Sequence, residues 1–238
     1  MKNKILNFLL VVSLVLTLCI TLNACKDANS IIYAGKELSL TKALEQVSNG
    51  GTIILDQNIT LDSQVVVNKQ VTIDLGGFAI NNTQDIWNNS DGIKTWSLIS
   101  VQAGGNLTIK NGSMLAKEND CYAIDVRDGA SLTVESGDYV GNISVVYVHT
   151  GNAEIKGGNF KIQQLDDNFG DHRHLLNCLD ANWQNQTASI TVTGGVFENY
   201  DPSNNQSLEN NLVAEGYSVT SSTANGNTYY SVISNNAT

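Results

Sequence analysis

A phrase of eight residues recurs five times along the chain and constrains its fold more than any other feature. Each copy has apolar residues at positions 1 and 3, a small polar turn with glycine, and a large apolar residue at position 8. A unit this short cannot bury its own apolar side, so the copies must stack on one another. The copies are VTIDLGGF from Val71, LTIKNGSM from Leu107, LTVESGDY from Leu132, AEIKGGNF from Ala153 and ITVTGGVF from Ile190.

A second alternating segment precedes the last four copies, so each repeat is predicted to hold two strands that pair in parallel with their equivalents. Alternation points every second residue inward. It therefore sends Asp125 and Arg127 to the outer, solvent side of their strand, because Ile124 and Val126 point in. The segments are SLISV from Ser97, YAIDV from Tyr122, SVVYV from Ser144 and HLLNCL from His174.

The segment before the repeats predicts one helix and then short strands. Leu40, Ala43, Leu44 and Val47 share one helical face, and Gly50-Gly51 ends the helix. Alternating apolar residues between glycine, asparagine and aspartate breaks predict the strands. These are Thr52–Leu55, Ile59–Leu61, Val65–Val67 and Val71–Leu75.

Together these features resemble the right-handed parallel β-helix superfamily, which includes pectate lyases, polygalacturonases and adhesin-like surface proteins. The resemblance covers about residues 36–200 and includes a cap helix followed by NGGTIIL and VVVNKQVTIDLGGFAI. It implies an all-β fold: a single-stranded right-handed parallel β-helix, or solenoid, with an N-terminal capping helix. The tail resembles a terminal cap of bacterial β-helix proteins. A β-sandwich is the alternative fold, but it would need hairpin reversals that the repeat does not show.

The N-terminus has the pattern of a processing signal. Lys2 and Lys4 precede an apolar run that ends in Leu22-Asn23-Ala24-Cys25, which resembles a bacterial lipoprotein lipobox. The resemblance implies cleavage before Cys25, its lipidation, and a place in the cell envelope as an outer-membrane or cell-surface lipoprotein. An uncleaved transmembrane helix or a soluble secreted protein are the alternatives. We therefore expect a signal peptide at 1–24, the lipidated cysteine and a linker at 25–35, the β-helix at 36–198 and the cap at 199–238.

The net charge of the chain limits the kinds of partner that it can bind. The chain has 13 Lys and Arg against 23 Asp and Glu, and loss of Lys2 and Lys4 with the signal moves the net charge from −10 to −12. This surface repels phosphate backbones, so nucleic acid is excluded as a partner. Two cysteines remain after Cys19 and Cys25 are accounted for. Cys178 aligns with inward Val126, whereas Cys121 precedes its strand two repeats away, too far for a disulfide.

Candidate ligand contacts lie where the repeats are lengthened. All three tryptophans, Trp87, Trp96 and Trp183, fall in or beside insertions, and amides such as Asn182 adjoin Trp183. Indole faces stack on the C–H faces of sugars, and amides pair with hydroxyl groups, so these residues predict glycan contact. Alternatively, each tryptophan packs back against its own loop.

Two acidic or histidine-containing stretches are candidate metal sites. Asp166, Asp167 and Asp171 could supply oxygen ligands to calcium, although they lack the spacing of a calcium loop and a closing bidentate glutamate. His172 and His174 could contribute to zinc, but no third ligand is specified. A solvated acidic turn and locally hydrogen-bonded histidines are the alternatives, so no cofactor is predicted.

Catalysis by analogy with β-helix lyases would need an Arg or Lys base beside acidic residues. The candidates are Asp125 with Arg127, and Asp171 with Arg173. An Asp-x-Arg pair on a solvent face is more often a weak surface ion pair. No Gly-rich phosphate loop or nucleophile elbow is present in the sequence.

Three functions remain open from the sequence. The first is a lipid-anchored, non-catalytic β-helix that binds glycans or a surface. The second is a polysaccharide lyase or glycoside hydrolase acting on uronate-containing polymers, which the superfamily suggests but the fold alone does not imply. The third is a purely structural module. The missing catalytic signature and the tryptophan placement favour the first.

Overall fold

The computed structural model describes residues 30–86, 96–117, 122–164, 174–204, 208 and 210–236. Within these residues the strands form a seven-stranded, an eight-stranded and a five-stranded sheet, and two short helices accompany them. The fold is therefore mostly β, and the pairing inside the sheets is parallel except where β20 (Asn227–Ser234) pairs with its two neighbours. From β2 (Thr52–Leu55) to β18 (Gly195–Glu198) successive strands go to the three sheets in turn, so each sheet gains a strand with every passage of the chain. We call one such passage a coil.

The first sheet, sheet A, carries the start of each recurring phrase. All its pairings are parallel. In spatial order it contains β1 (Ile31–Ala34), β2 (Thr52–Leu55), β5 (Gln70–Asp74), β8 (Asn106–Lys110), β11 (Ala130–Val134), β14 (Gly151–Ile155) and β17 (Ala188–Val192). The sequence predicts a linker at 25–35, but β1 lies in this stretch. Its residues pair with β2, so this part of the stretch belongs to sheet A.

The second sheet, sheet B, carries the end of each phrase. The phrase is therefore two strands joined by a glycine turn, and the prediction of two strands per repeat was short by one. Its strands are β3 (Ile59–Leu61), β6 (Ala79–Asn82), β9 (Ser113–Leu115), β12 (Asp138–Gly141), β15 (Asn159–Ile162), β18 (Gly195–Glu198), β20 (Asn227–Ser234) and β19 (Tyr217–Ala224).

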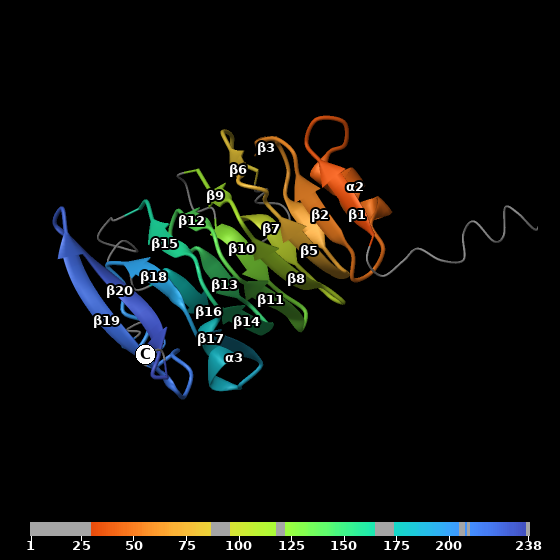
Figure 1. Cartoon of the computed structure of the whole chain (residues 1–238). Coiled ribbons are helices and arrows are strands. Elements are labelled where there is room, and N and C mark those ends of the chain that lie inside the picture. The colour runs from red at the N-terminus through yellow and green to blue at the C-terminus, as the bar shows by residue number, and fades with distance from the viewer. Residues whose placement is uncertain are drawn as a thin grey trace, which may run out of the picture.

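Sheet C holds the alternating segments that precede the phrases. Its strands are β4 (Val65–Val67), β7 (Ser97–Val101), β10 (Tyr122–Val126), β13 (Val146–Val148) and β16 (Leu176–Cys178). Figure 1 shows the strands following one another in chain order along the stack, from the orange end to the blue end.

The predicted register is confirmed in the rows that face the core. Leu107, Leu132, Ala153 and Ile190 are register partners in sheet A, as are Ile99, Ile124, Val146 and Leu176 in sheet C. In sheet B the rings of Tyr139, Phe160 and Phe197 stack with centroids 5.3 and 5.0 Å apart. Stacked like residues therefore fill the core from coil to coil.

Cys178 continues a core row as the sequence predicts. It pairs with Val148 and is 1% exposed. Burial, reinforced by Asp180, raises the pKa of its thiol to about 12, so the thiol stays protonated. It is free in the structure, whereas Cys121 lies outside the described residues.

A doublet of buried residues interrupts the alternation at or just before the start of every sheet C strand except β4. Both members of every doublet are fully buried and belong to the hydrophobic core. Residues on either side of a doublet therefore share the outer side of the sheet. The doublets are Leu98-Ile99, Ala123-Ile124, Val145-Val146 and Leu175-Leu176.

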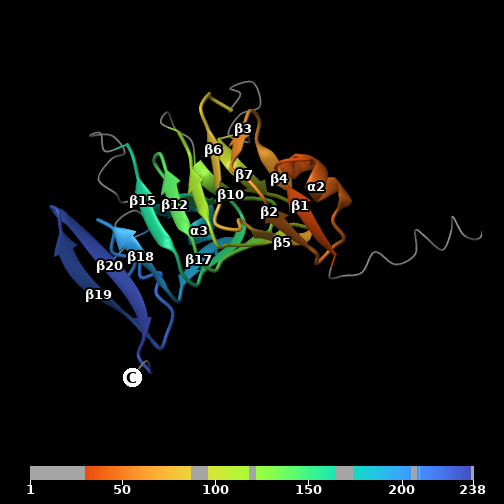
Figure 2. The ribbon, with the colours of Figure 1, turned by 45° about the horizontal axis from the view of Figure 1, so that its top comes forward.

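The two ends of the stack are closed differently. At the first end lies α2 (Leu40–Gln46), whose N-terminus is capped by the Ser39 side chain and whose last carbonyls accept hydrogen bonds from Lys69 Nζ. At the other end β20 pairs antiparallel with β18 and β19 pairs with β20. Figure 2 shows this hairpin at the end of the stack opposite α2.

Glycine is required in the turns between sheets A and B. Gly137 and Gly158 occupy equivalent turns in successive coils and have φ of 123° and 110°. A Cβ on Gly137 would lie 2.6 Å from the carbonyl oxygen of Gly112, and one on Gly158 would lie 3.0 Å from that of Gly137. Only glycine allows this backbone conformation and this close stacking.

Candidate functional site

Trp183 lies in α3 (Asp180–Gln184), the single helical turn that joins β16 to β17. The backbone N–H of Trp183 donates to Leu179 O at 2.9 Å, and Gln186 then turns the chain with a left-handed φ of 59°. The indole is half-buried and packs partly against the core. The turn therefore holds Trp183 in place while leaving part of its ring accessible.

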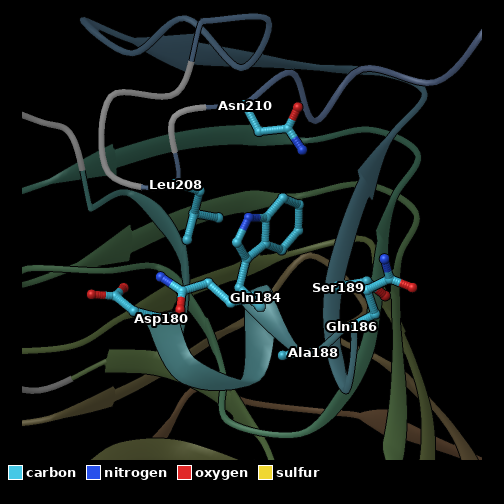
Figure 3. Close-up of a pocket in the computed structure, with 8 residues that line it drawn as sticks. Asp180, Gln184, Gln186, Ala188, Ser189, Leu208 and Asn210 are labelled. Carbon is cyan, nitrogen blue, oxygen red and sulfur yellow. The ribbon is translucent and has the colours of Figure 1, made fainter.

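A pocket of about 750 Å³ opens beside this turn. Three parts of the chain build it: α3, the start of β17, and the tail segment around residue 210. Figure 3 shows Asp180 and Gln184 on the helix, Gln186 and Ser189 on the opposite wall, and Leu208 and Asn210 above them. We call it the Trp183 pocket; its lining residues are Asp180, Trp183, Gln184, Gln186, Ala188, Ser189, Leu208 and Asn210.

The tail reaches the Trp183 pocket because it runs along the edge of sheet A. Val213 forms a parallel bridge with Val192 of β17, and Val192 N donates to Leu212 O at 2.8 Å. Ala214 N donates back to Val192 O at 3.0 Å. These bonds fix the segment that carries Leu208 and Asn210 against α3.

The Trp183 pocket combines one indole with exposed amide, hydroxyl and carboxylate groups. Small-ligand sites are usually lined mostly by apolar side chains, so the polar lining of this pocket favours a ligand that forms many hydrogen bonds. The indole offers an apolar face, while Gln184, Gln186, Asn210 and Ser189 offer donors and acceptors. This arrangement suits a ring with one apolar face and a rim of hydroxyl groups.

The other predicted sugar contacts are not gathered at this pocket. Trp96 precedes β7, three coils before α3, which separates the strands by about 14 Å at the usual spacing. Asn182 lies on α3, but its Nδ2 donates to His149 O at 2.5 Å. Trp87 lies outside the described residues, as do Cys25, Asp166, Asp167, Asp171, His172 and Arg173.

Asp125 and Arg127 are buried, which corrects the prediction of an exposed surface pair. Asp125 is 0% exposed and Arg127 is 7% exposed. Arg127 Nε and Nη2 both donate to Asp125 Oδ2, at 2.6 and 2.5 Å. Alternation correctly points both side chains away from the core, but it does not say what covers the outer side of the sheet.

Aromatic rings pack over that outer side. Tyr147 is the register partner of Asp125, the ring of Tyr122 stacks on Tyr147 at 4.9 Å, and Trp96 packs at 6.3 Å from Tyr122. His149 meets Tyr147 edge-on at 5.0 Å. Trp96 therefore belongs to an aromatic row on sheet C.

Burial shifts the titration of the polar groups in this region. It raises the pKa of Asp125 above its ordinary value, and Arg127, Ser100 and Ser97 oppose that rise. Burial and then the nearby Arg127 lower the pKa of His149 to about 4, against a small opposing effect of Asp128. His149 is therefore neutral at pH 7.

This low pKa predicts that His149 makes stability depend on pH. The unfolded chain protonates His149 near pH 6.5 and the folded chain only near 4, so stability is lost as pH falls through this window. We expect a loss of about 1–2 kcal/mol after solvent screening. Asp125 acts in the opposite sense, since a raised carboxyl pKa favours the folded state on acidification.

Urea unfolding of wild type and His149→Gln at pH 7 and pH 4.5 isolates the effect. Between pH 7 and pH 4.5 the free energy of unfolding of wild type should fall by more than that of His149→Gln. Equal losses would show that His149 titrates normally in the folded chain.

Comparison with protein-family models, with curated proteins and with solved structures found no match. Among the residues that the structure describes, no three His, Cys, Asp or Glu side chains converge as a metal site. No described helix is long and apolar enough to cross a membrane.

Proposed function

We propose that this chain is a right-handed parallel β-helix that binds glycans without catalysis, anchored in the bacterial envelope by a lipid on Cys25. The three parallel sheets, filled in turn by successive strands, support the solenoid. The apolar run ending in Leu22-Asn23-Ala24-Cys25 supports the lipid anchor and a location at the outer membrane or cell surface. Several acyl chains would hold such a protein stably to the membrane.

One observation carries the glycan assignment: the Trp183 pocket. Its indole is held half-exposed, and the surrounding side chains are mostly uncharged hydrogen-bonding groups. Asp180 is the one ionisable side chain among its described lining residues. A mostly neutral polar pocket with an aromatic wall matches the hydroxyl groups and apolar face of a sugar better than it matches an ion or a peptide.

Catalysis on uronate polymers is the less supported alternative. A lyase base must be free to accept a proton, yet Arg127 Nε and Nη2 both donate to Asp125 Oδ2, and Asp125 itself is 0% exposed. The second candidate pair, Asp171 with Arg173, lies outside the described residues. An assay for unsaturated products and reducing ends with uronate polymers, with and without calcium, separates the two functions.

A glycan array probed with the full chain tests the proposal. We expect binding to a restricted set of oligosaccharides and no release of shorter products from them. The matched control is Trp183→Ala, which removes the indole and should abolish the array signal. Absence of binding by the folded wild-type chain would refute the proposal.

A further inference from the structure

A second pocket lies beside the same helix. It has a volume of about 230 Å³, and Asn182 of α3 contributes to it, whereas Asp180, Trp183 and Gln184 contribute to the Trp183 pocket. The helix therefore supplies residues to both pockets. We call the second one the Arg127 pocket; its lining residues are Gln102, Arg127, Asp128, His149, Thr150 and Asn182.

Three of these residues form a row at the ends of the sheet C strands. Gln102, Arg127 and His149 directly follow Val101, Val126 and Val148, which are register partners in successive coils. The repeat therefore brings the three side chains into line on the outer side of the sheet. Every lining residue is polar, so the Arg127 pocket does not serve to bury apolar surface.

The repeat also shows that the fold does not need a charged pair here. The residues equivalent to Asp125 in the neighbouring coils are Val66, Ser100, Tyr147 and Asn177, all uncharged. Those equivalent to Arg127 include Gln102 and His149. Burying an ion pair is costly and is often no more stable than apolar packing. The pair therefore has another role.

That role is orientation of Arg127, because Asp125 accepts hydrogen bonds from two nitrogens of the Arg127 guanidinium, and two amide side chains of the Arg127 pocket are also held by protein groups. Arg127 donates to Asp125, as described above. Gln102 Nε2 donates to Ser100 Oγ at 3.1 Å, and Asn182 Nδ2 donates to His149 O at 2.5 Å. Polar groups fixed in this way lose little freedom on binding, which favours a ligand that hydrogen-bonds to all of them.

Charge selects the class of ligand. Asp125 compensates Arg127, and the exposed Asp128 adds a negative charge at the pocket. The chain as a whole has a net charge of −10. An acidic sugar would be repelled by Asp128, and no cation of the pocket is free to offset that repulsion because Asp125 already compensates Arg127. A neutral sugar can instead donate hydroxyl hydrogens to Asp128 and accept hydrogen bonds from Arg127 and Gln102.

We propose that the Arg127 pocket is a second sugar subsite that accepts a neutral monosaccharide unit, with Asp125 as the residue that positions Arg127. The subsite rests on the proposed glycan-binding function and gives it a substrate class: an uncharged oligosaccharide that contacts both pockets beside α3. Asp128 makes the subsite reject acidic units.

The test is an array of neutral oligosaccharides and of uronate- and sialate-containing ones, probed with the full chain and three variants. Trp183→Ala reports on the Trp183 pocket. The double variant Asp125→Asn/Arg127→Gln removes both charges together, so no buried charge is left unpaired. Asp128→Asn changes one exposed group at a left-handed φ of 55° that asparagine tolerates.

We expect wild type to prefer neutral glycans. The double variant should weaken their binding by about tenfold or more, with its melting temperature recorded in parallel. Asp128→Asn should weaken the binding of neutral glycans and strengthen the binding of acidic glycans. If the double variant does not fold, Asp128→Asn alone tests the subsite. A further variant, Arg127→Lys, keeps the charge but lacks the planar fork, so a wild-type affinity for neutral glycans in this variant would contradict orientation by Asp125.

The outcomes separate the two proposals. A wild-type chain that prefers acidic glycans overturns the subsite but leaves glycan binding standing. Loss of binding in Trp183→Ala, with Asp128→Asn and the double variant unchanged, also overturns the subsite alone. A folded wild-type chain that binds no glycan overturns the proposed function and the subsite together.

Discussion

Replacing Asp125 with alanine is expected to lower the free energy of unfolding by about 3–5 kcal/mol, as removal of one partner from a buried ion pair does. The substitution leaves the Arg127 guanidinium, 7% exposed, without its carboxylate. It also opens a space beside Ser100 and Tyr147, the register partners of Asp125. Equilibrium urea unfolding measures the effect.

The chain supplies a matched control in Glu154→Ala. Glu154 and Lys156 form an ion pair at 3.1 Å with the same spacing of two residues along a strand, but both side chains are exposed. Loss of an exposed pair should cost about 0.5 kcal/mol or less. Similar unfolding midpoints for Asp125→Ala and Glu154→Ala would contradict the burial of the Asp125–Arg127 pair.

Replacing Ile124 with aspartate should destabilise the fold by several kcal/mol, or keep the new carboxyl protonated through a raised pKa. Ile124 is 0% exposed and lies between Ile99 and Val146 in its core row. The neighbouring core offers no cation and no hydrogen-bond donor in that row. Val126→Asp should behave in the same way, because its partners are Val101 and Val148.

Ser131→Asp is the control, since it places the same carboxylate on the outer side of sheet A beside Asn106 and Asn152. It should change stability by about 0.5 kcal/mol. If Ile124→Asp and Ser131→Asp unfold at the same urea concentration, the register of sheet C is wrong and the stacked core with it.

Alternation in the sequence was enough to predict most strands of sheets A and C and the register of their core rows. The rows headed by Ile99 and Leu107 could be read off because period-2 spacing and the recurring glycine turn leave one consistent way to stack the copies. From residue 97 onward the third strand of each coil was missed, because segments such as Ser113–Leu115 were counted as the end of the recurring phrase, whereas Ile59–Leu61 was predicted as a strand. β1 was missed because Ile31–Ala34 lies in the stretch predicted to be a linker and its residues do not alternate between apolar and polar.

Burial of the outer side of sheet C could not be predicted from the same pattern. A period of two gives the direction of the Asp125 side chain but not what lies beyond it. Doublets such as Ala123-Ile124 were a sign that simple alternation does not describe this sheet, because two consecutive apolar residues in every repeat shift the alternation. Aligning the repeats would also have drawn attention to Gln102, Arg127 and His149 as one row.

The candidate site was predictable in part. Trp183 stood out because it lies in the longest insertion between two strands of a coil. The contribution of Leu208 and Asn210 to the pocket was not predictable from the sequence. It depends on the bridge between Val192 and Val213, and no sequence pattern in the tail predicts that pairing. The helical turn of α3 was likewise hidden, because five residues carry no periodicity.

Isothermal titration calorimetry of the strongest array glycan against wild type, Trp183→Phe and Trp183→Ala tests glycan binding at the Trp183 pocket most directly. Truncation of a central aromatic residue costs 2 kcal/mol or more at a binding hot spot, so Trp183→Ala should raise the Kd by about thirtyfold. Trp183→Phe keeps an aromatic face and should lose only part of the affinity. Equal dissociation constants for wild type and Trp183→Ala, with both chains folded, would contradict the account.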